Sequence, residues 1–284
     1  MKIIPQCVAA IAAAGTLLAP SSATAQTTSF NTGSLGSPGN GTNTANVTLG
    51  LSGAISAGND LAVGYAGGAH TSVDFNPALN PAAGSPFTIE FWAKPGIVVD
   101  DGLGPAPVFN RVSSGSRSGW VFFQRSGATG WNFRMYDGNG SNTGFDLTGG
   151  TYSVNAWSHV VAVWDGSTPL LYVDGLLADN TSTGSGIYNA SSQAKFTIGS
   201  YDDSANPFTG SIDETAFYQT ALNPAQILAH FNAAASPIAG TYSSLIHSDG
   251  AVEYLQNNPI PEPSSVALIG LGLAGCGFNR FRRK

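Results

Sequence analysis

The sequence is poor in residues that hold metal ions or form cross-links. Only two cysteines occur in 284 residues, Cys7 and Cys276, and both fall in terminal segments that we expect to be removed. The four histidines lie far apart and no H-E-x-x-H or Cys/His set is present, so the common zinc motifs are excluded. We therefore expect the exported domain to fold without disulfides.

Charged residues are scarce, and basic ones especially so. The chain has 11 Lys and Arg against 17 Asp and Glu, for a formal net charge of −6. Five of the basic residues lie in the terminal segments, so six remain against the 17 acidic ones if Glu262 is kept, a net charge near −11. This excess repels polyanions, and we expect no nucleic acid and no anionic lipid surface as partners of the domain.

Long helical patterns are absent, whereas 36 glycines and 16 prolines are spread along the chain. This density of turn residues is typical of an all-β domain and stays below the level that indicates disorder. The clearest stretch is 157–175, in which side chains alternate over Trp157–Asp165, resume over Leu170–Val173 and end at Asp174-Gly175. This pattern predicts two strands and a tight hairpin, with the first strand covered on both faces.

Similar short runs recur at a spacing of roughly ten residues, which is typical of sandwiches and jelly rolls. They cover 61–65, 70–75, 87–95, 108–112, 120–124, 131–136, 145–147, 195–199 and 210–218, followed by a short helix over 225–231.

The N-terminus has the features of a secretory signal peptide. Lys2 precedes an apolar run from Val8 to Leu18, and Ala23-Thr24-Ala25 matches an A-x-A cleavage site. We expect residues 1–25 to form a signal helix that is removed after Ala25. The alternative is a buried amphipathic helix.

The C-terminus combines Pro261-Glu262-Pro263, an apolar stretch over 265–278 and a basic tail. The tail contains Arg280, Arg282, Arg283 and Lys284. Fourteen apolar residues are fewer than the ~17–25 of an ordinary transmembrane helix. Segment 261–284 resembles the PEP-CTERM sorting signal of Gram-negative bacteria. The resemblance implies a hydrophobic helix with transient inner-membrane contact, processing by an exosortase, and a destination at the cell surface or in the extracellular matrix. The alternative is a plain C-terminal anchor.

The central segments resemble a known family. FTIEFWAKP, WSHVVAVWDGSTPLLYVDG, KFTIGS and FTGSIDETAFYQTALNPAQI follow one another as in the LamG-like jelly rolls of the concanavalin A-like lectin/glucanase superfamily. The resemblance covers about 31–235 and implies an all-β, antiparallel two-sheet jelly-roll sandwich. We assign 47–235 to this domain and 26–46 to a polar linker or edge segment. Residues 236–260 are then a spacer, in which 251–255 either adds a strand in place of a missing first strand or stays unpaired.

Glycan hydrolases occur in this superfamily, but the sequence argues against one. Retaining glycosidases need two carboxyl groups ~5 Å apart. Asp213 and Glu214 are the one acidic pair on a predicted strand, and neighbouring strand residues point to opposite faces. We therefore expect no enzyme activity.

The resemblance implies another role for Asp213, because in related jelly rolls the aspartate of the last long strand helps to bind a structural Ca²⁺. The alternative is that Asp213 accepts hydrogen bonds from a loop, with Glu214 solvated or paired with a basic residue. Asp202 and Asp203 are candidates for a rim site for calcium or sugar. Trp120 and Trp131 begin strands after Gly-rich loops and are candidates for sugar stacking, whereas Trp92, Trp157 and Trp164 are expected in the core.

These observations predict an exported, non-catalytic domain that binds glycan or protein at the cell surface or in the exopolysaccharide matrix. The alternative is a passive structural protein of that matrix. Extracellular polysaccharide and matrix protein are the expected partners beside the exosortase.

Overall fold

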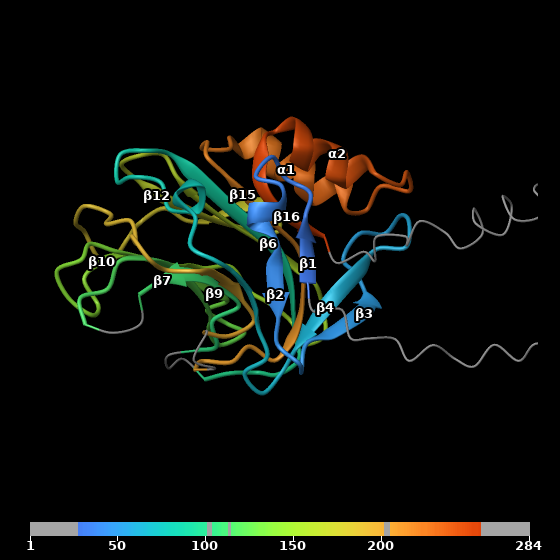
Figure 1. Cartoon of the computed structure of the whole chain (residues 1–284), viewed down its shortest axis with the longest axis horizontal. Helices are drawn as coiled ribbons and strands as arrows, with labels where there is room; N and C mark the ends of the chain where they lie inside the picture. The colour runs from blue at the N-terminus through green and yellow to red at the C-terminus, as the bar shows by residue number, and fades with distance from the viewer. Residues whose placement is uncertain (1–27, 101–103, 113–114, 202–204, 257–284) are drawn as a thin grey trace, which may run out of the picture.

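The computed structural model describes residues 28–100, 104–112, 115–201 and 205–256. Within these ranges the chain forms two antiparallel sheets packed face to face, with two short helices on one outer side (Figure 1). The two-sheet jelly roll expected from the sequence is confirmed. The helices expected on 1–25 and 261–284 lie outside the described residues. None of the helices in the described ranges has the length and apolar character needed to span a bilayer.

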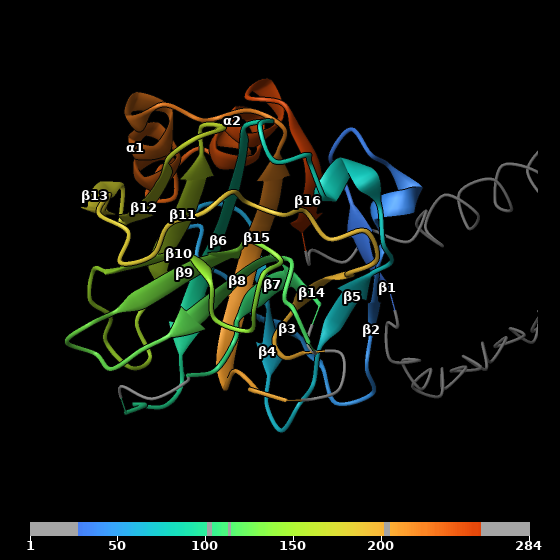
Figure 2. The ribbon, with the colours of Figure 1, turned by 90° about the vertical axis from the view of Figure 1, so that its left-hand side faces the viewer.

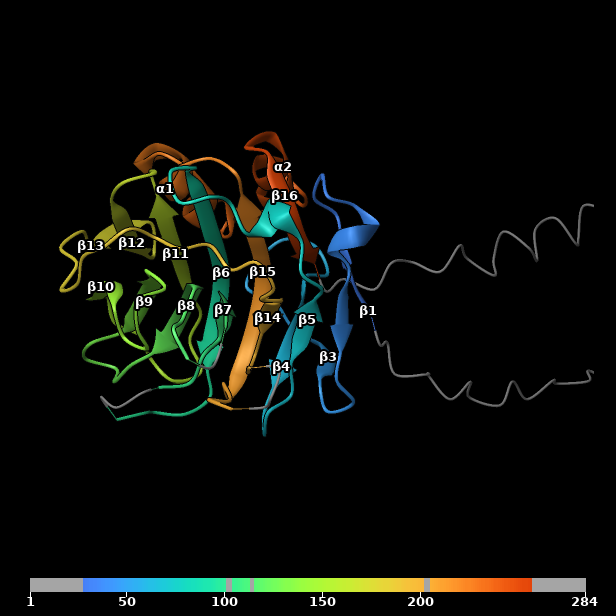
Figure 3. The same ribbon diagram turned by 60° about the vertical axis from the view of Figure 1, so that its left-hand side comes forward.

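Figure 2 and Figure 3 show the strands of both layers from two further sides. Sheet A contains, in spatial order, β10 (Gly144–Gly149), β9 (Trp131–Tyr136), β8 (Gly119–Gln124), β7 (Val108–Arg111), β14 (Phe196–Ile198), β5 (Thr71–Val73) and β2 (Gly41–Asn43). Sheet B contains β16 (Ala251–Gln256), β15 (Gly210–Tyr218), β6 (Phe87–Pro95), β11 (Ser158–Trp164), β12 (Pro169–Val173) and β13 (Leu176–Asp179). Two further strands extend it through β15, namely β4 (Leu61–Tyr65) and β3 (Thr48–Ser52).

Sheet B is covered on both faces, as the alternation in 157–165 predicts. In β11, Val160 and Ala162 belong to the core between the sheets, whereas Val161 and Val163 pack in a second core under the helices. These helices are α1 (Pro224–Ala233) and α2 (Thr241–Ser248). The predicted hairpin is also present, since Asp174 and Gly175 have φ values of 52° and 77° between β12 and β13.

The N-terminal residues correct the expectation of a polar linker or edge at 26–46. β1 (Thr28–Asn31) pairs with β2 on one side and with β16 on the other, so it joins the two sheets. Asn31 explains how so polar a segment is held: its Oδ1 accepts hydrogen bonds from the backbone N–H groups of Tyr254 and Gly33, at 2.7 and 2.8 Å. The 3-10 helices are η1 (Ser37–Gly39) and η2 (Pro77–Leu79).

The strand predicted at 251–255 is β16, which pairs with β15 and β1. It does not replace a missing first strand, because β1 is present beside it. The rest of 236–250 is not a spacer either, since Tyr242 and Ile246 of α2 are buried in the second core. The folded unit therefore extends beyond the predicted 47–235, from β1 to β16.

Candidate functional site

A group of three carboxylates lies where β15 passes the loop before β4. One carboxylate oxygen each from Asp60, Asp213 and Glu214 lies within 4.8 Å of the others. Asp213 and Glu214 are buried, whereas Asp60 is half-buried. The sequence pointed to Asp213 but missed Asp60, which is 153 positions away in the chain.

The backbone of β15 brings Glu214 to the same side as Asp213. The pairing of β15 with β6 is irregular between Asp213 and Ala216, and Glu214 has a φ of 50°. Such a bulge breaks the alternation of a regular strand and redirects a side chain. Two expectations are therefore wrong: the two neighbours do not point to opposite faces, and Glu214 is neither solvated nor paired with a basic residue.

Backbone and tyrosine groups hold the three carboxylates in place. Asp213 Oδ2 accepts from the backbone N–H of Ala54 at 2.8 Å, and Asp60 Oδ2 accepts from that of Ile55 at 2.7 Å. The hydroxyl of Tyr254 donates to Glu214. A Cβ atom added at Gly53 would lie 2.0 Å from Asp60 Oδ2 and 2.7 Å from Asp213 Oδ2, so glycine is needed where the loop passes the carboxylates.

The group has an excess of negative charge. Burial, and then the charges of the neighbouring carboxylates, raise the pKa of Asp213 and of Glu214 well above their usual values. Within the described residues no lysine, arginine or histidine forms an ion pair with any of the three. Carboxylate oxygens at this spacing fit a hard divalent cation such as Ca²⁺, which would offset their mutual repulsion.

A pocket of about 290 Å³ lies beside these carboxylates. Its polar lining includes Asn59, Asp60, Glu214, Tyr242, Ser243 and Gln256. The carboxylate spacing is also close to that of retaining glycosidases. However, both oxygens of Asp213 accept backbone hydrogen bonds and the residue is only 1% exposed, so it cannot reach a sugar.

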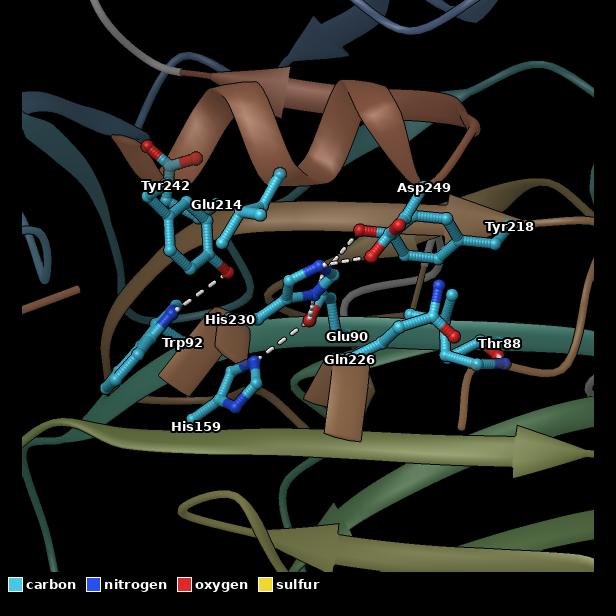
Figure 4. Close-up of polar contacts among 12 residues, drawn as sticks. Thr88, Glu90, Trp92, His159, Glu214, Tyr218, Gln226, His230, Tyr242 and Asp249 are labelled. Atoms are coloured by element: carbon cyan, nitrogen blue, oxygen red, sulfur yellow. Dashed lines mark hydrogen bonds and ion pairs between the residues drawn. The ribbon is translucent and has the colours of Figure 1, made fainter. Parts of the chain in front are cut away.

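A second polar cluster lies between sheet B and the helices (Figure 4). Nε2 of His159 lies 2.9 Å from Glu90 Oε2, and Nδ1 of His230 lies 3.1 Å from both carboxylate oxygens. Glu90, His159 and His230 are fully buried. They are therefore closed to ligands and serve to attach α1 to sheet B.

The tryptophans named in the sequence analysis lie in or beside the cores of the domain. Trp120 and Trp131 are wrong as ligand-stacking candidates, because both are 0% exposed in the core between the sheets. Side chains alternate between the two faces of the sheet along β8 and β9, and both tryptophans occupy positions that face the core. Trp92 and Trp164 are in the core as expected, and Trp157 packs at its margin.

The remaining predicted residues lie outside the described ranges. They are Asp202, Asp203, the cleavage site at Ala23 and Ala25, and the sorting residues Pro261, Glu262, Pro263, Arg280, Arg282 and Arg283.

Comparison with solved structures finds chains that are similar to this one. Domain 4 of an extracellular arabinanase from Geobacillus stearothermophilus, determined with arabinotriose, matches with a TM-score of 0.47 and 16% identity over 71% of this chain and 96% of that one. The binding domain of botulinum neurotoxin serotype D matches at 0.50 and 17%, over 67% and 45%. A putative carbohydrate-binding protein from Bacteroides ovatus matches at 0.46 and 15%, over 69% and 50%. This chain thus spans about half the length of the latter two proteins.

Two family models match the sequence, whereas no curated protein does. The model of the PEP-CTERM protein-sorting motif covers residues 259–284 and indicates export with envelope sorting of the Gram-negative type, processed by an exosortase. The model of the concanavalin A-like lectin/glucanases superfamily covers residues 66–228, more than half of the sequence. The chain therefore belongs to the concanavalin A-like lectin/glucanase superfamily and ends in a PEP-CTERM sorting motif.

Proposed function

We propose that this chain is an exported, non-catalytic binding domain that recognises glycan or protein at the cell surface or in the exopolysaccharide matrix. The observation that carries the proposal is the carboxylate group of Asp60, Asp213 and Glu214 with the pocket beside it, which Asp60 and Glu214 line. A passive matrix component has no need of a pocket beside three carboxylates that lack a counter-charge among the described residues. The superfamily membership and the sorting motif support binding outside the cell.

In this proposal Ca²⁺ occupies the three-carboxylate group and fixes the loop around Gly53 and Asp60. Calcium prefers carboxylate and carbonyl oxygens, and the cell exterior supplies it. Asp213 and Glu214 hold the ion from β15, and Asp60 holds it from the loop. Gln256, the last residue of β16, lines the pocket beside this group.

The test is a glycan array probed with the exported protein, with Ca²⁺ and with EDTA. We expect binding that EDTA removes and that Asp213→Asn weakens. Asp74→Asn is the matched control, because Asp74 is exposed and pairs only with the exposed Lys195 in the described structure. Absence of binding to any glycan or matrix protein under both conditions would favour the passive structural alternative. Release of reducing sugar from a bound glycan would show a hydrolase instead.

A further inference from the structure

The outer face of sheet A has a charge opposite to that of the rest of the domain. All four arginines in the described residues, Arg111, Arg117, Arg125 and Arg134, lie on β7, β8, β9 or the turns that join them. Figure 2 shows these three strands side by side. In a chain with 17 acidic residues, this clustering gives one face a local positive charge.

Arg111 is the centre of this face. It ends β7 and is only 7% exposed, with its guanidinium carbon 4.4 Å from the ring centre of Tyr201 and 5.5 Å from that of Tyr136. Within the described ranges its Nε and Nη1 atoms have no hydrogen-bond partner and it forms no ion pair. Cation–π contacts offset only part of the cost of an unpaired buried charge. An anion in this position would offset that cost.

The groups around Arg111 are also hydrogen-bonding groups without partners. The hydroxyl of Tyr136 and Oγ1 of Thr197 are buried and have no partner in the part of the chain that the structure describes. Thr197 pairs with Phe109 in the ladder and so lies on the same face as Arg111. Burial raises the pKa of Tyr201 to about 12 although the Arg111 charge opposes the rise, so this hydroxyl keeps its proton and can donate.

Arg117 supplies a second guanidinium beside Tyr136. It lies 5.8 Å from that ring, and its Nη1 is positioned by Ser141 O and Asn142 Oδ1 at 2.5 and 3.0 Å. The Nε of Arg117 is buried and without a hydrogen-bond partner among the described residues.

The acidic side chains on this part of sheet A already have other contacts. Asp137 accepts hydrogen bonds from Thr143 and Asn139, and Asp146 pairs with Arg134 at 2.8 Å. Within the described residues, the charges of Arg111 and Arg117 are therefore not neutralised by the protein.

A small polar pocket adjoins the same tyrosine. It has a volume of about 110 Å³ and is lined by Arg134, Tyr136, Asn142, Thr143, Asp146 and Thr183 among others. These side chains offer both donors and acceptors, as sugar hydroxyls require. A ligand with an anionic group at Arg111 and hydroxyl groups in this pocket would form hydrogen bonds with both the arginine and the polar side chains of the pocket.

We propose that the outer face of sheet A binds an acidic saccharide, with the carboxylate of a uronic acid held by Arg111 and Arg117 and ring hydroxyls held in the pocket beside Tyr136. Guanidinium groups match planar carboxylates with two parallel hydrogen bonds. The acidic remainder of the domain disfavours long polyanions such as nucleic acid, because it repels them over long range. The inference adopts glycan binding from the proposed function but uses a site separate from the carboxylate pocket.

The test is calorimetric titration of the exported protein, in EDTA, with a galacturonic acid trimer, a neutral galactose trimer and sodium sulfate. We expect the acidic trimer to bind at least about tenfold more tightly than the other two, since charged hydrogen bonds contribute ~1.5–3 kcal/mol. Arg111→Met and Arg117→Met should each weaken binding of the acidic trimer by about tenfold or more. Lys94→Met, which removes a positive charge from β6 in sheet B, is the matched control and should bind like the parent. Added salt should weaken binding.

Stability separates a binding role of Arg111 from a structural one. Arg111→Met should keep or raise the melting temperature without ligand, because methionine removes an unpaired buried charge. The acidic trimer should raise the melting temperature of the parent but not of this variant. Equal binding of both trimers, equally tight sulfate binding, or parent-like binding by Arg111→Met would each overturn the inference. EDTA-sensitive binding of neutral glycans alone would overturn it while leaving the proposed function intact.

Discussion

Nδ1 of His230 lies 3.1 Å from both carboxylate oxygens of Glu90, although 140 residues separate the two in the chain. Nε2 of His230 lies 2.9 Å from Asp249 Oδ2, and the hydroxyl of Tyr218 donates a hydrogen bond to Glu90. Burial alone would raise the pKa of Glu90, but the His230 charge and the hydrogen bonds from both histidines lower it well below its usual value. Glu90 is therefore the ionised centre that connects β6, α1 and the end of α2.

Replacing Glu90 by Gln should destabilise the domain by ~3–5 kcal/mol, because breaking a buried ion pair leaves its partner uncompensated. Urea unfolding at neutral pH measures this change. Asp165→Asn is the control, since Asp165 is an exposed turn residue with local hydrogen bonds. A cost for Glu90→Gln no larger than that of the control would show that the cluster does not attach the helices.

The buried carboxyl of Glu253 on β16 should make the folding stability of the domain depend on pH. It is fully buried, neither carboxyl oxygen has a partner in the described structure, and burial raises its pKa to about 9. Its folded-state pKa lies above the unfolded value of 4.5, so the folded state holds the proton more tightly. The folded state therefore loses stability relative to the unfolded state as pH rises from about 4.5 to 9.

Glu253→Gln should remove that loss, which amounts to several kcal/mol at full effect. The melting temperatures of parent and variant are measured from pH 5 to pH 9, in steps of about one pH unit. The two curves should diverge toward high pH, with the variant more stable. Parallel curves would mean that the Glu253 carboxyl finds a partner in solution.

Calcium should bind the Asp60, Asp213 and Glu214 group and release protons. The raised pKa values of Asp213 and Glu214 mean that, without a cation, these carboxyls retain protons to higher pH than usual. Because metal ligands must be deprotonated, the affinity should rise with pH. At 100 times its dissociation constant, calcium should stabilise the domain by ~2.7 kcal/mol.

Calorimetry in two buffers of different ionisation enthalpy measures the proton release that accompanies calcium binding. Asp213→Asn should abolish the calcium-dependent rise in melting temperature. Asp74→Asn should leave it unchanged. Equal stabilisation of the Asp213 variant and its parent by calcium would place any bound ion elsewhere.

Trp120→Ala should lower stability by ~3–5 kcal/mol without a specific effect on ligand binding. Trp120 contacts Phe122, Phe196 and Phe217 with ring centres 5.7–6.4 Å apart, inside the core between the sheets. Thermal unfolding measures the loss, and binding at a temperature where the variant is folded separates the two effects. A variant of unchanged stability that no longer binds glycan would restore Trp120 as a stacking residue.

Much of the architecture could be predicted because its signals are local. Alternation in 87–95 and 157–165, the Asp174-Gly175 turn, and Asn223-Pro224 before α1 each specify a strand, a hairpin or a helix start within a few residues. β1 was missed because its polar sequence contributes little to the core, and it is held by hydrogen bonds to β2 and β16.

The sequence by itself determined the jelly-roll class and the terminal sorting motif, since alternation, turn residues and short motifs act over neighbouring positions, whereas it left the strand at 251–255 open. Only the tertiary structure decided which side chains meet. A bulge in β15 turns Glu214 toward Asp213, a loop 153 residues away adds Asp60, and strand parity hides Trp120 and Trp131. These outcomes depend on register and on contacts between distant segments, which local patterns do not encode.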